Sequence, residues 1–185
     1  IALVHNGIIE KHDKLRNELK AKGYEFLSDT DTEVMVHTIH DLRKTSDSLL
    51  SAVQSAVKLF EGAYGTVVFD KDNDNEMIVS RSGSPLVIGL GLGENFIASD
   101  QLALLPVTRS FMFLEEGDVA RVTSESVEIY DLNGELVERE VHESNITQDA
   151  SGKGEFRHYM LKETYEQPVA VRNTLEGRLT DDRVG

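Results

Sequence analysis

The N-terminal part of the chain begins with an apolar run and then shows the periodicity of amphipathic helices. The run at residues 1–4 predicts a strand that is interrupted at His5-Asn6-Gly7. Apolar residues three and four positions apart then predict three helices, of which the second begins at a capping box formed by Thr30 and Glu33. The predicted apolar faces are Ile8, His12, Leu15 and Leu19; Met35, Ile39 and Leu42; and Leu49, Val53, Ala56 and Phe60.

Beyond residue 62 the pattern changes to short β-rich runs separated by Asp, Asn, Gly and Ser. Such runs predict antiparallel strands, and Asn133-Gly134 is a strong hairpin signal. Three helices followed by mostly antiparallel strands predict an α+β fold with helices packed on a sheet. The predicted strands lie at residues 64–69, 77–80, 86–88, 96–98, 111–114, 119–122, 127–130 and 136–141.

The composition changes once more near residue 145. The segment that follows is polar, with almost no apolar content, which is typical of a linker. Two short helices are predicted after it, with Pro168 at the first position of the second one. They offer too few apolar side chains for a core of their own. The predicted organisation is a domain over residues 1–145, a linker over 146–155, and the truncated start of another module over 156–185, with helices at 156–166 and 168–177.

Charge and composition exclude several classes of function. The 185 residues hold 19 Lys plus Arg and 33 Asp plus Glu, for a formal net charge of −14. A surface this negative repels phosphate groups, so neither nucleic acid nor an anionic membrane is an expected partner. The longest apolar run, residues 85–93, is far shorter than the roughly 20 residues that span a bilayer, and a cytoplasmic protein is the default expectation. The chain has no cysteine, which excludes disulfides and any cysteine nucleophile among these residues.

Two motifs resemble metal sites, but the surrounding sequence argues against both. Asp70, Asp72 and Asp74 have the spacing that opens a calcium loop, yet the glycine and the glutamate that such a loop requires are missing. A solvated hairpin turn is the better interpretation. His37 and His40 share one predicted helix, but no further ligand has the spacing to complete a metal site.

Asn6-Gly7 and Asp31 are the residues with candidate chemistry. A side-chain amide and a glycine N–H at the end of a buried strand can converge on one oxygen, as in an oxyanion hole, although the dipeptide alone favours a plain turn. Asp31 follows the N-cap of the second predicted helix. Its carboxylate either interacts with the helix dipole alone or pairs with the α-ammonium of an amino acid. The local sequence leaves both questions open.

Five ordered motifs resemble those of the class II glutamine amidotransferases, whose fold is the four-layer αββα sandwich of the Ntn hydrolases with mostly antiparallel sheets. A sixth motif, in the tail, is similar to the junction with a sugar-isomerase half in one branch of that family. The six are His5-Asn6-Gly7-Ile8-Ile9-Glu10, Ser28-Asp29-Thr30-Asp31-Thr32-Glu33-Val34, Gly62-Ala63-Tyr64-Gly65, Ser82-Gly83-Ser84-Pro85-Leu86, Ala98-Ser99-Asp100, and His158-Tyr159-Met160-x-Lys162-Glu163 with Glu166-Gln167-Pro168.

The resemblance implies a glutaminase mechanism without a metal or organic cofactor. In the family an N-terminal cysteine attacks the carboxamide of L-glutamine, and a thioester forms before water releases glutamate. In the branch with the isomerase half, ammonia then converts fructose 6-phosphate to glucosamine 6-phosphate, and the full-length protein is expected to be a homodimer. Carried over by position, Asn6 and Gly7 would stabilise the oxyanion, and Asp31 would hold the α-ammonium of glutamine.

The sequence also departs from the family pattern. The catalytic cysteine and the Arg-Trp-x-Thr-His stretch that helps to bind glutamine are not among these residues, so we expect a glutaminase domain incomplete at its N-terminus and inactive by itself. Lys11 stands where the family usually has Asn. Two alternatives stay open: another class II amidotransferase with a different ammonia acceptor, or a glutamine-binding regulatory module without a nucleophile.

Overall fold

The computed structural model describes residues 1–145, 154–175, 179–180 and 183–184. It divides the chain into two compact units, Ile1–Asn145 and Ile146–Gly185. The first unit has an α+β fold in which every neighbouring pair of strands is antiparallel, so the predicted class is confirmed.

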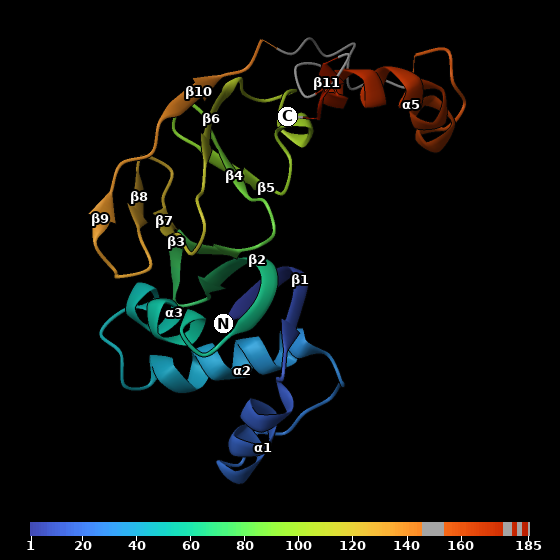
Figure 1. Cartoon of the computed structure of the whole chain (residues 1–185). Helices are drawn as coiled ribbons and strands as arrows, with labels where there is room; N and C mark the ends of the chain where they lie inside the picture. The colour runs from blue at the N-terminus through green and yellow to red at the C-terminus, as the bar shows by residue number, and fades with distance from the viewer. Residues whose placement is uncertain (146–153, 176–178, 181–182, 185) are drawn as a thin grey trace. The chain divides into compact units, whose positions relative to one another are not determined.

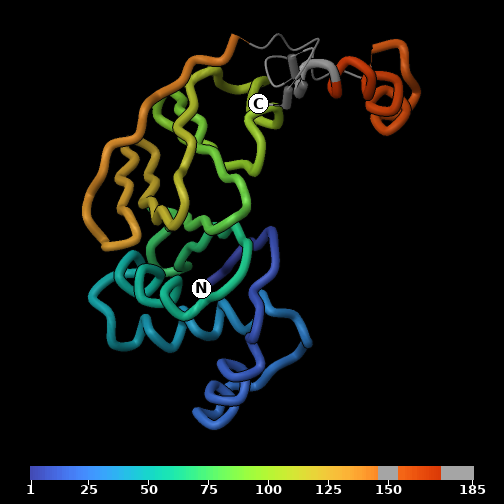
Figure 2. The backbone as a smooth tube through the Cα atoms, viewed as in Figure 1, coloured from blue at the N-terminus to red at the C-terminus, as the bar shows by residue number. Residues whose placement is uncertain are grey.

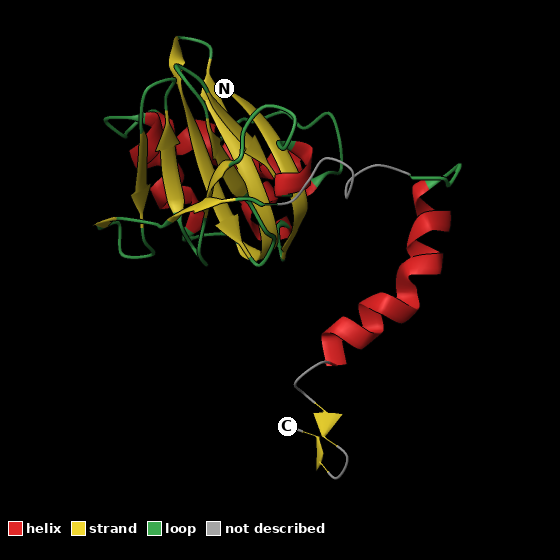
Figure 3. Ribbon diagram, turned by 90° about the horizontal axis from the view of Figure 1, so that it is seen from above, coloured by secondary structure: helices red, strands yellow, loops and turns green. Residues whose placement is uncertain are grey.

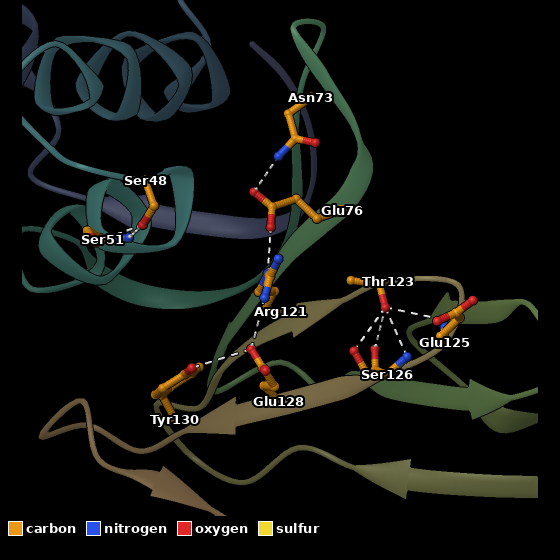
Figure 4. Close-up of polar contacts among 10 residues, drawn as sticks. All are labelled: Ser48, Ser51, Asn73, Glu76, Arg121, Thr123, Glu125, Ser126, Glu128 and Tyr130. Carbon is orange, nitrogen blue, oxygen red and sulfur yellow. Dashed lines mark hydrogen bonds and ion pairs between the residues drawn. The ribbon is translucent and has the colours of Figure 1, made fainter.

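Three helices form one side of the first unit: α1 (Asp13–Ala21), α2 (Asp31–Arg43) and α3 (Leu49–Val57). Figure 1 shows α2 and α3 against the strands, with α1 farther out beside α2. The N-terminus of α2 is where the capping box predicted it, since the Thr30 hydroxyl accepts a hydrogen bond from the backbone N–H of Glu33. The N-terminus of α3 is capped in the same way by Ser48, whose hydroxyl accepts from the N–H of Ser51 (Figure 4).

The first predicted helix is partly wrong, because its proposed face begins inside a strand. Ile8 belongs to β1 (Ala2–Glu10), and α1 starts only at Asp13. The chain leaves the strand at Lys11, which has a left-handed φ of 51°. A spacing of four between Ile8 and His12 imitated helical periodicity across this turn.

Six strands form the larger sheet, in the order β1-β2-β3-β7-β8-β9. The hairpins predicted at Asp70 to Asp74 and at Asn133-Gly134 join β2 to β3 and β8 to β9. The tube in Figure 2 follows these reversals along the chain. The bounds are β2 (Glu61–Asp70), β3 (Asn73–Ser82), β7 (Val119–Val122), β8 (Val127–Tyr130) and β9 (Leu136–Val137).

The smaller sheet has four strands, in the order β10-β6-β4-β5. The segment predicted as one strand at residues 136–141 is divided between the two sheets, because β9 ends at Val137 and β10 pairs with β6. A hydrophobicity pattern does not reveal such a change of sheet. The bounds are β4 (Val87–Leu90), β5 (Asn95–Ala98), β6 (Ser110–Phe113) and β10 (Val141–Glu143).

Two apolar cores hold these layers together. Successive residues of β3 point to opposite faces, so Ile78 packs among the helices whereas Val79 packs between the two sheets. In Figure 3, which looks down on this unit, most of the helical ribbon lies behind the strands. On the outer face of the smaller sheet lie the short helix η1 (Gln101–Ala103) and the residues after it, and an added Cβ at Gly89 would be 3.0 Å from Leu104. Within the described part of this unit, the fourth layer of the expected sandwich is therefore a short turn.

A row of polar contacts joins three strands of the larger sheet (Figure 4). Glu76 on β3 accepts hydrogen bonds from Asn73 and from Arg121 on β7, and Arg121 also contacts Glu128 on β8, which accepts from Tyr130. Arg121 and Glu128 are directly opposed in the strand register. These pairs favour the observed register of three neighbouring strands.

In its described residues, the second unit has one helix where two were predicted. Helix α5 (Tyr159–Leu175) continues through Pro168, which lies inside the helix rather than at its first position. Proline lacks an N–H and removes one helical hydrogen bond, but turns on both sides keep the helical path. The hairpin formed by β11 (Leu179–Thr180) and β12 (Arg183–Val184) follows, and Gly177, part of the second predicted helix, lies outside the described residues.

Candidate functional site

Asn6 and Gly7 lie in the middle of β1, so both the predicted turn and the predicted strand end are wrong. Asn6 is opposite Gly65 of β2, and Gly7 is opposite Tyr64. Gly7 has a φ of 131°, and an added Cβ would be 2.1 Å from the carbonyl oxygen of Ala63. The backbone of β2 therefore admits only glycine at this position.

The side chain of Asn6 is on the exposed face of β1. Side chains alternate along a strand, and Ile9 is buried in the core beneath the helices. Val4, Asn6 and Ile8, which have the opposite parity, are all exposed. Asn6 can therefore present its amide to a ligand on the face of β1 that lies away from the helices.

Asp31 joins the start of α2 to the open edge of β1. Its Oδ2 atom accepts a hydrogen bond of 2.9 Å from the N–H of Ile9, and its Oδ1 atom accepts one of 2.8 Å from the N–H of Thr32. Among the described strands, β1 pairs with β2 alone, so its other edge is unpaired. The N–H of Ile9 points to that unpaired edge, where Asp31 accepts from it. The Asp31 side chain remains 18% exposed. The structure thus brings this carboxylate close to the strand that carries Asn6 and Gly7.

His5 is a third residue at this junction, and sequence reasoning assigned it no role. Its Nδ1 atom is 2.9 Å from the hydroxyl of Thr32 and 3.8 Å from Oδ1 of Asp31, and its side chain is only 3% exposed. Burial lowers the pKa of His5 below its ordinary value, and the negative charge of Asp31 opposes that shift in part. The imidazole is therefore neutral near pH 7. Its place at the head of the His5-Asn6-Gly7 motif was the available signal.

The loop before Asp31 is held by Glu33. Its carboxylate accepts hydrogen bonds of 2.7 Å from the N–H groups of Leu27 and Ser28 and one of 2.6 Å from the Ser28 hydroxyl. The Ser28 hydroxyl, followed by these N–H groups, lowers the pKa of Glu33 to about 2. In a capping box the carboxylate of Glu33 would accept a hydrogen bond from the Thr30 N–H. Here it binds the preceding loop instead.

The two histidines that resembled part of a metal site have other partners. His40 contacts the Tyr24 hydroxyl at 2.8 Å, and the His37 ring packs against Tyr24 and Phe26. Within the described ranges, no group of three or more His, Asp or Glu side chains could hold a metal ion. A cavity of about 500 Å³ lies between the end of α3 and the turns beside β7 and β8, and neither Asn6 nor Asp31 lines it.

The part of the chain that contains β1 and α2 matches a known protein family. A family model described as a glutamine amidotransferase domain matches residues 1–106, the part of the chain that contains Asn6, Gly7 and Asp31. The chain belongs to the glutamine amidotransferase domain family.

Curated relatives narrow the class to one branch. The chain is 67% identical over 184 residues to the glutamine–fructose-6-phosphate aminotransferase (isomerizing) of Shewanella oneidensis, and 65% identical over 181 residues to that of Idiomarina loihiensis. The protein of the same name from Haemophilus influenzae is 59% identical over 183 residues. These matches cover 98% to 100% of this chain, which itself spans 30% of the length of each relative. They confirm the branch that the tail motif indicated.

Solved structures confirm the Ntn-hydrolase fold. The glutamine phosphoribosylpyrophosphate amidotransferase from B. subtilis matches 73% of this chain and 30% of its own chain, with a TM-score of 0.61 and 26% identity. A structure described as the allosteric regulatory enzyme of purine biosynthesis matches 71% of this chain and 28% of its own, with a TM-score of 0.60 and 26% identity. In the part of the chain that the structure describes, no helix is long and apolar enough to cross a membrane.

Proposed function

We propose that this chain is the glutaminase portion of an enzyme that transfers ammonia from L-glutamine to fructose 6-phosphate. The observation that carries the proposal is the place of Asp31, whose carboxylate binds the backbone of β1 at Ile9, two residues beyond Gly7. The amide of Asn6 and Gly7, with its positive φ, thus lie on β1, and the carboxylate of Asp31 lies at the start of α2 beside it. Family membership and the names of the relatives support the same function.

Each proposed role follows from the chemistry of amide hydrolysis. Attack by a thiolate on the carboxamide carbon places negative charge on the carbonyl oxygen, which the amide of Asn6 and the N–H of Gly7 would stabilise. The α-amine of the N-terminal cysteine would take the proton of the thiol and pass it to the amide nitrogen, so that collapse of this intermediate breaks the C–N bond and releases ammonia. Water then hydrolyses the thioester to glutamate and frees the thiol. Asp31 would hold the α-ammonium group, and so would fix the substrate relative to the two donors.

The thiol has to come from outside residues 1–185, because these contain no cysteine. We therefore expect these residues alone to be inactive. A binding or regulatory module without a nucleophile is the alternative. The N-terminal sequence or the intact mass of the full-length protein distinguishes the two: a cysteine at the mature N-terminus supports the enzyme, and its absence supports the module.

An isotope label on the amide nitrogen of glutamine tests which molecule accepts the ammonia. Full-length protein supplied with amide-¹⁵N glutamine and fructose 6-phosphate should place the label in the amine of glucosamine 6-phosphate. Labelled ammonia or another labelled product, with no labelled amino sugar, would favour an amidotransferase with a different acceptor. Residues 156–185, within the second unit, would be the start of the sugar-isomerase half, and residues 146–155 would be the linker before it. A homodimer and a cytoplasmic location remain predictions for the full-length protein.

A further inference from the structure

Arg16 is a buried cation beside the loop that precedes Asp31. It lies on α1, and only 8% of the residue is exposed. Its guanidinium donates from Nη1 to the carbonyl of Ser28 and from Nη2 to the carbonyl of Thr30, both at 2.8 Å. The Phe26 ring covers the guanidinium, with its centroid 4.5 Å from the central carbon. No carboxylate of the described residues forms an ion pair with it.

Both hydrogen bonds of the Arg16 guanidinium therefore go to carbonyls of the loop that leads into Asp31. A buried charge is costly unless its N–H groups are satisfied, so the guanidinium and the two carbonyls hold one another in place. Glu33 binds the same loop through Leu27 and Ser28. One charged side chain thus fixes the carbonyls of the loop, and another fixes its N–H groups.

The contact with Thr30 bears directly on Asp31. The carbonyl of Thr30 and the N–H of Asp31 belong to one planar peptide unit, so fixing the carbonyl oxygen also fixes the orientation of that peptide at Asp31. Asp31 is the first residue of α2, so the helix sets its backbone dihedrals, and the bond of its carboxylate to the Ile9 N–H sets the rotation of its side chain.

We propose that Arg16 is a positioning residue for glutamine binding, which acts by orienting Asp31 toward the α-ammonium of the substrate. This inference rests on the proposed function. The guanidinium of Arg16 donates to Ser28 and Thr30 and not to Asn6 or Gly7, so it should affect the binding of glutamine and leave the stabilisation of the oxyanion intact. It is the planar fork of two donors, and not the positive charge alone, that reaches both carbonyls.

The test uses the full-length protein with Arg16→Lys and Arg16→Gln. Neither Lys nor Gln reproduces the planar fork that donates to both carbonyls, so KM for glutamine should rise about tenfold in both variants, while kcat stays within about twofold of the wild-type value. The second substrate is glutaramate, which is glutamine without its α-amino group. Its kcat/KM should be the same in the variants and in the wild type, because it has no ammonium for Asp31 to hold.

Arg43→Gln is the matched control. Arg43 lies in the last turn of α2 and donates at 2.9 Å to the carbonyl of Ser46, so its removal also frees a loop carbonyl but far from Asp31. This variant should keep the wild-type KM. Equal losses with glutamine and glutaramate, or a loss of kcat at unchanged KM, would overturn the positioning role of Arg16.

Asp31→Asn separates this inference from the function on which it rests. If Asp31→Asn raises KM for glutamine and the Arg16 variants do not, the role of Arg16 is refuted and that of Asp31 stands. If Asp31→Asn leaves KM unchanged, the role of Asp31 is refuted, and that of Arg16 with it. Combining Arg16→Gln with Asp31→Asn should raise KM no further than Asp31→Asn alone, whereas additive increases would contradict action through Asp31.

Discussion

At the residue scale, two backbone positions of positive φ, one in β1 and one just after it, are occupied by different kinds of residue. Gly7 adopts a φ of 131° directly against β2, and Lys11 has a left-handed φ of 51° immediately after β1. The first position is occupied by glycine, which has no Cβ to clash. The second is occupied by a side chain that is strained in this conformation. The two residues therefore respond to substitution in opposite directions.

Gly7→Ala should remove glutaminase turnover and destabilise the protein. The new methyl group would be 2.1 Å from the Ala63 carbonyl oxygen and 2.7 Å from Cα of Tyr64, so β1 and β2 would have to separate. Gly23→Ala is the control, because Gly23 also has a positive φ of 90° but nothing within 4 Å of its Cβ position. It should lower the unfolding temperature slightly and leave turnover unchanged. Retained activity in Gly7→Ala would refute the observed pairing at this position.

Lys11→Asn should raise the unfolding temperature. Asparagine adopts left-handed φ more readily than lysine, and the ion pair that is lost, Lys11 with Glu61 at 2.6 Å, joins two side chains that are 76% and 64% exposed. Thermal unfolding of wild type and variant in the same buffer is the measurement. A lower unfolding temperature would mean that the ion pair outweighs the backbone strain.

At the element scale, local signals predicted the start of α2 and the hairpins, and missed what depends on neighbouring elements. The capping residue Thr30 and the turn at Asn133-Gly134 act through bonds a few residues apart, so a single sequence shows them. The length of β1 depends on its pairing with β2, some sixty residues away. The division between β9 and β10 likewise depends on which sheet receives each strand.

The free energy of unfolding should depend on pH through Glu33, which lies in the first turn of α2. Its pKa in the folded protein is about 2, against an ordinary value of 4.5, so its contribution is complete above the ordinary value and is lost as the pH falls toward about 2. Glu33→Gln should therefore unfold at a lower temperature than wild type near pH 7, and the difference should shrink as the pH is lowered to about 3. The exposed Glu25→Gln serves as control. A difference independent of pH would show that the carboxylate charge is not what stabilises the loop.

At the scale of the whole molecule, the candidate site is assembled from segments that the sequence keeps apart. The local sequence singled out Asn6, Gly7 and Asp31, and motif resemblance assigned their roles. No pattern in the sequence indicated that Asp31 would bind the backbone of β1. Arg16 gave no signal at all, since a charged residue on an amphipathic helix is expected in solvent. Its role depends on the packing of α1 beside the loop before α2, which only a tertiary structure shows.

The most direct test of the glutaminase site is the turnover of glutamine by the full-length protein with Asn6→Ala. Asn6 is exposed and makes no core contact, so the fold should survive, and the exposed Asn17→Ala on α1 controls for the loss of a surface amide. The loss of one oxyanion donor should lower kcat by roughly 10²–10³, with KM little changed. A kcat for Asn6→Ala equal to that of the wild type and of Asn17→Ala would contradict the assignment of Asn6, and with it the glutamine site described above.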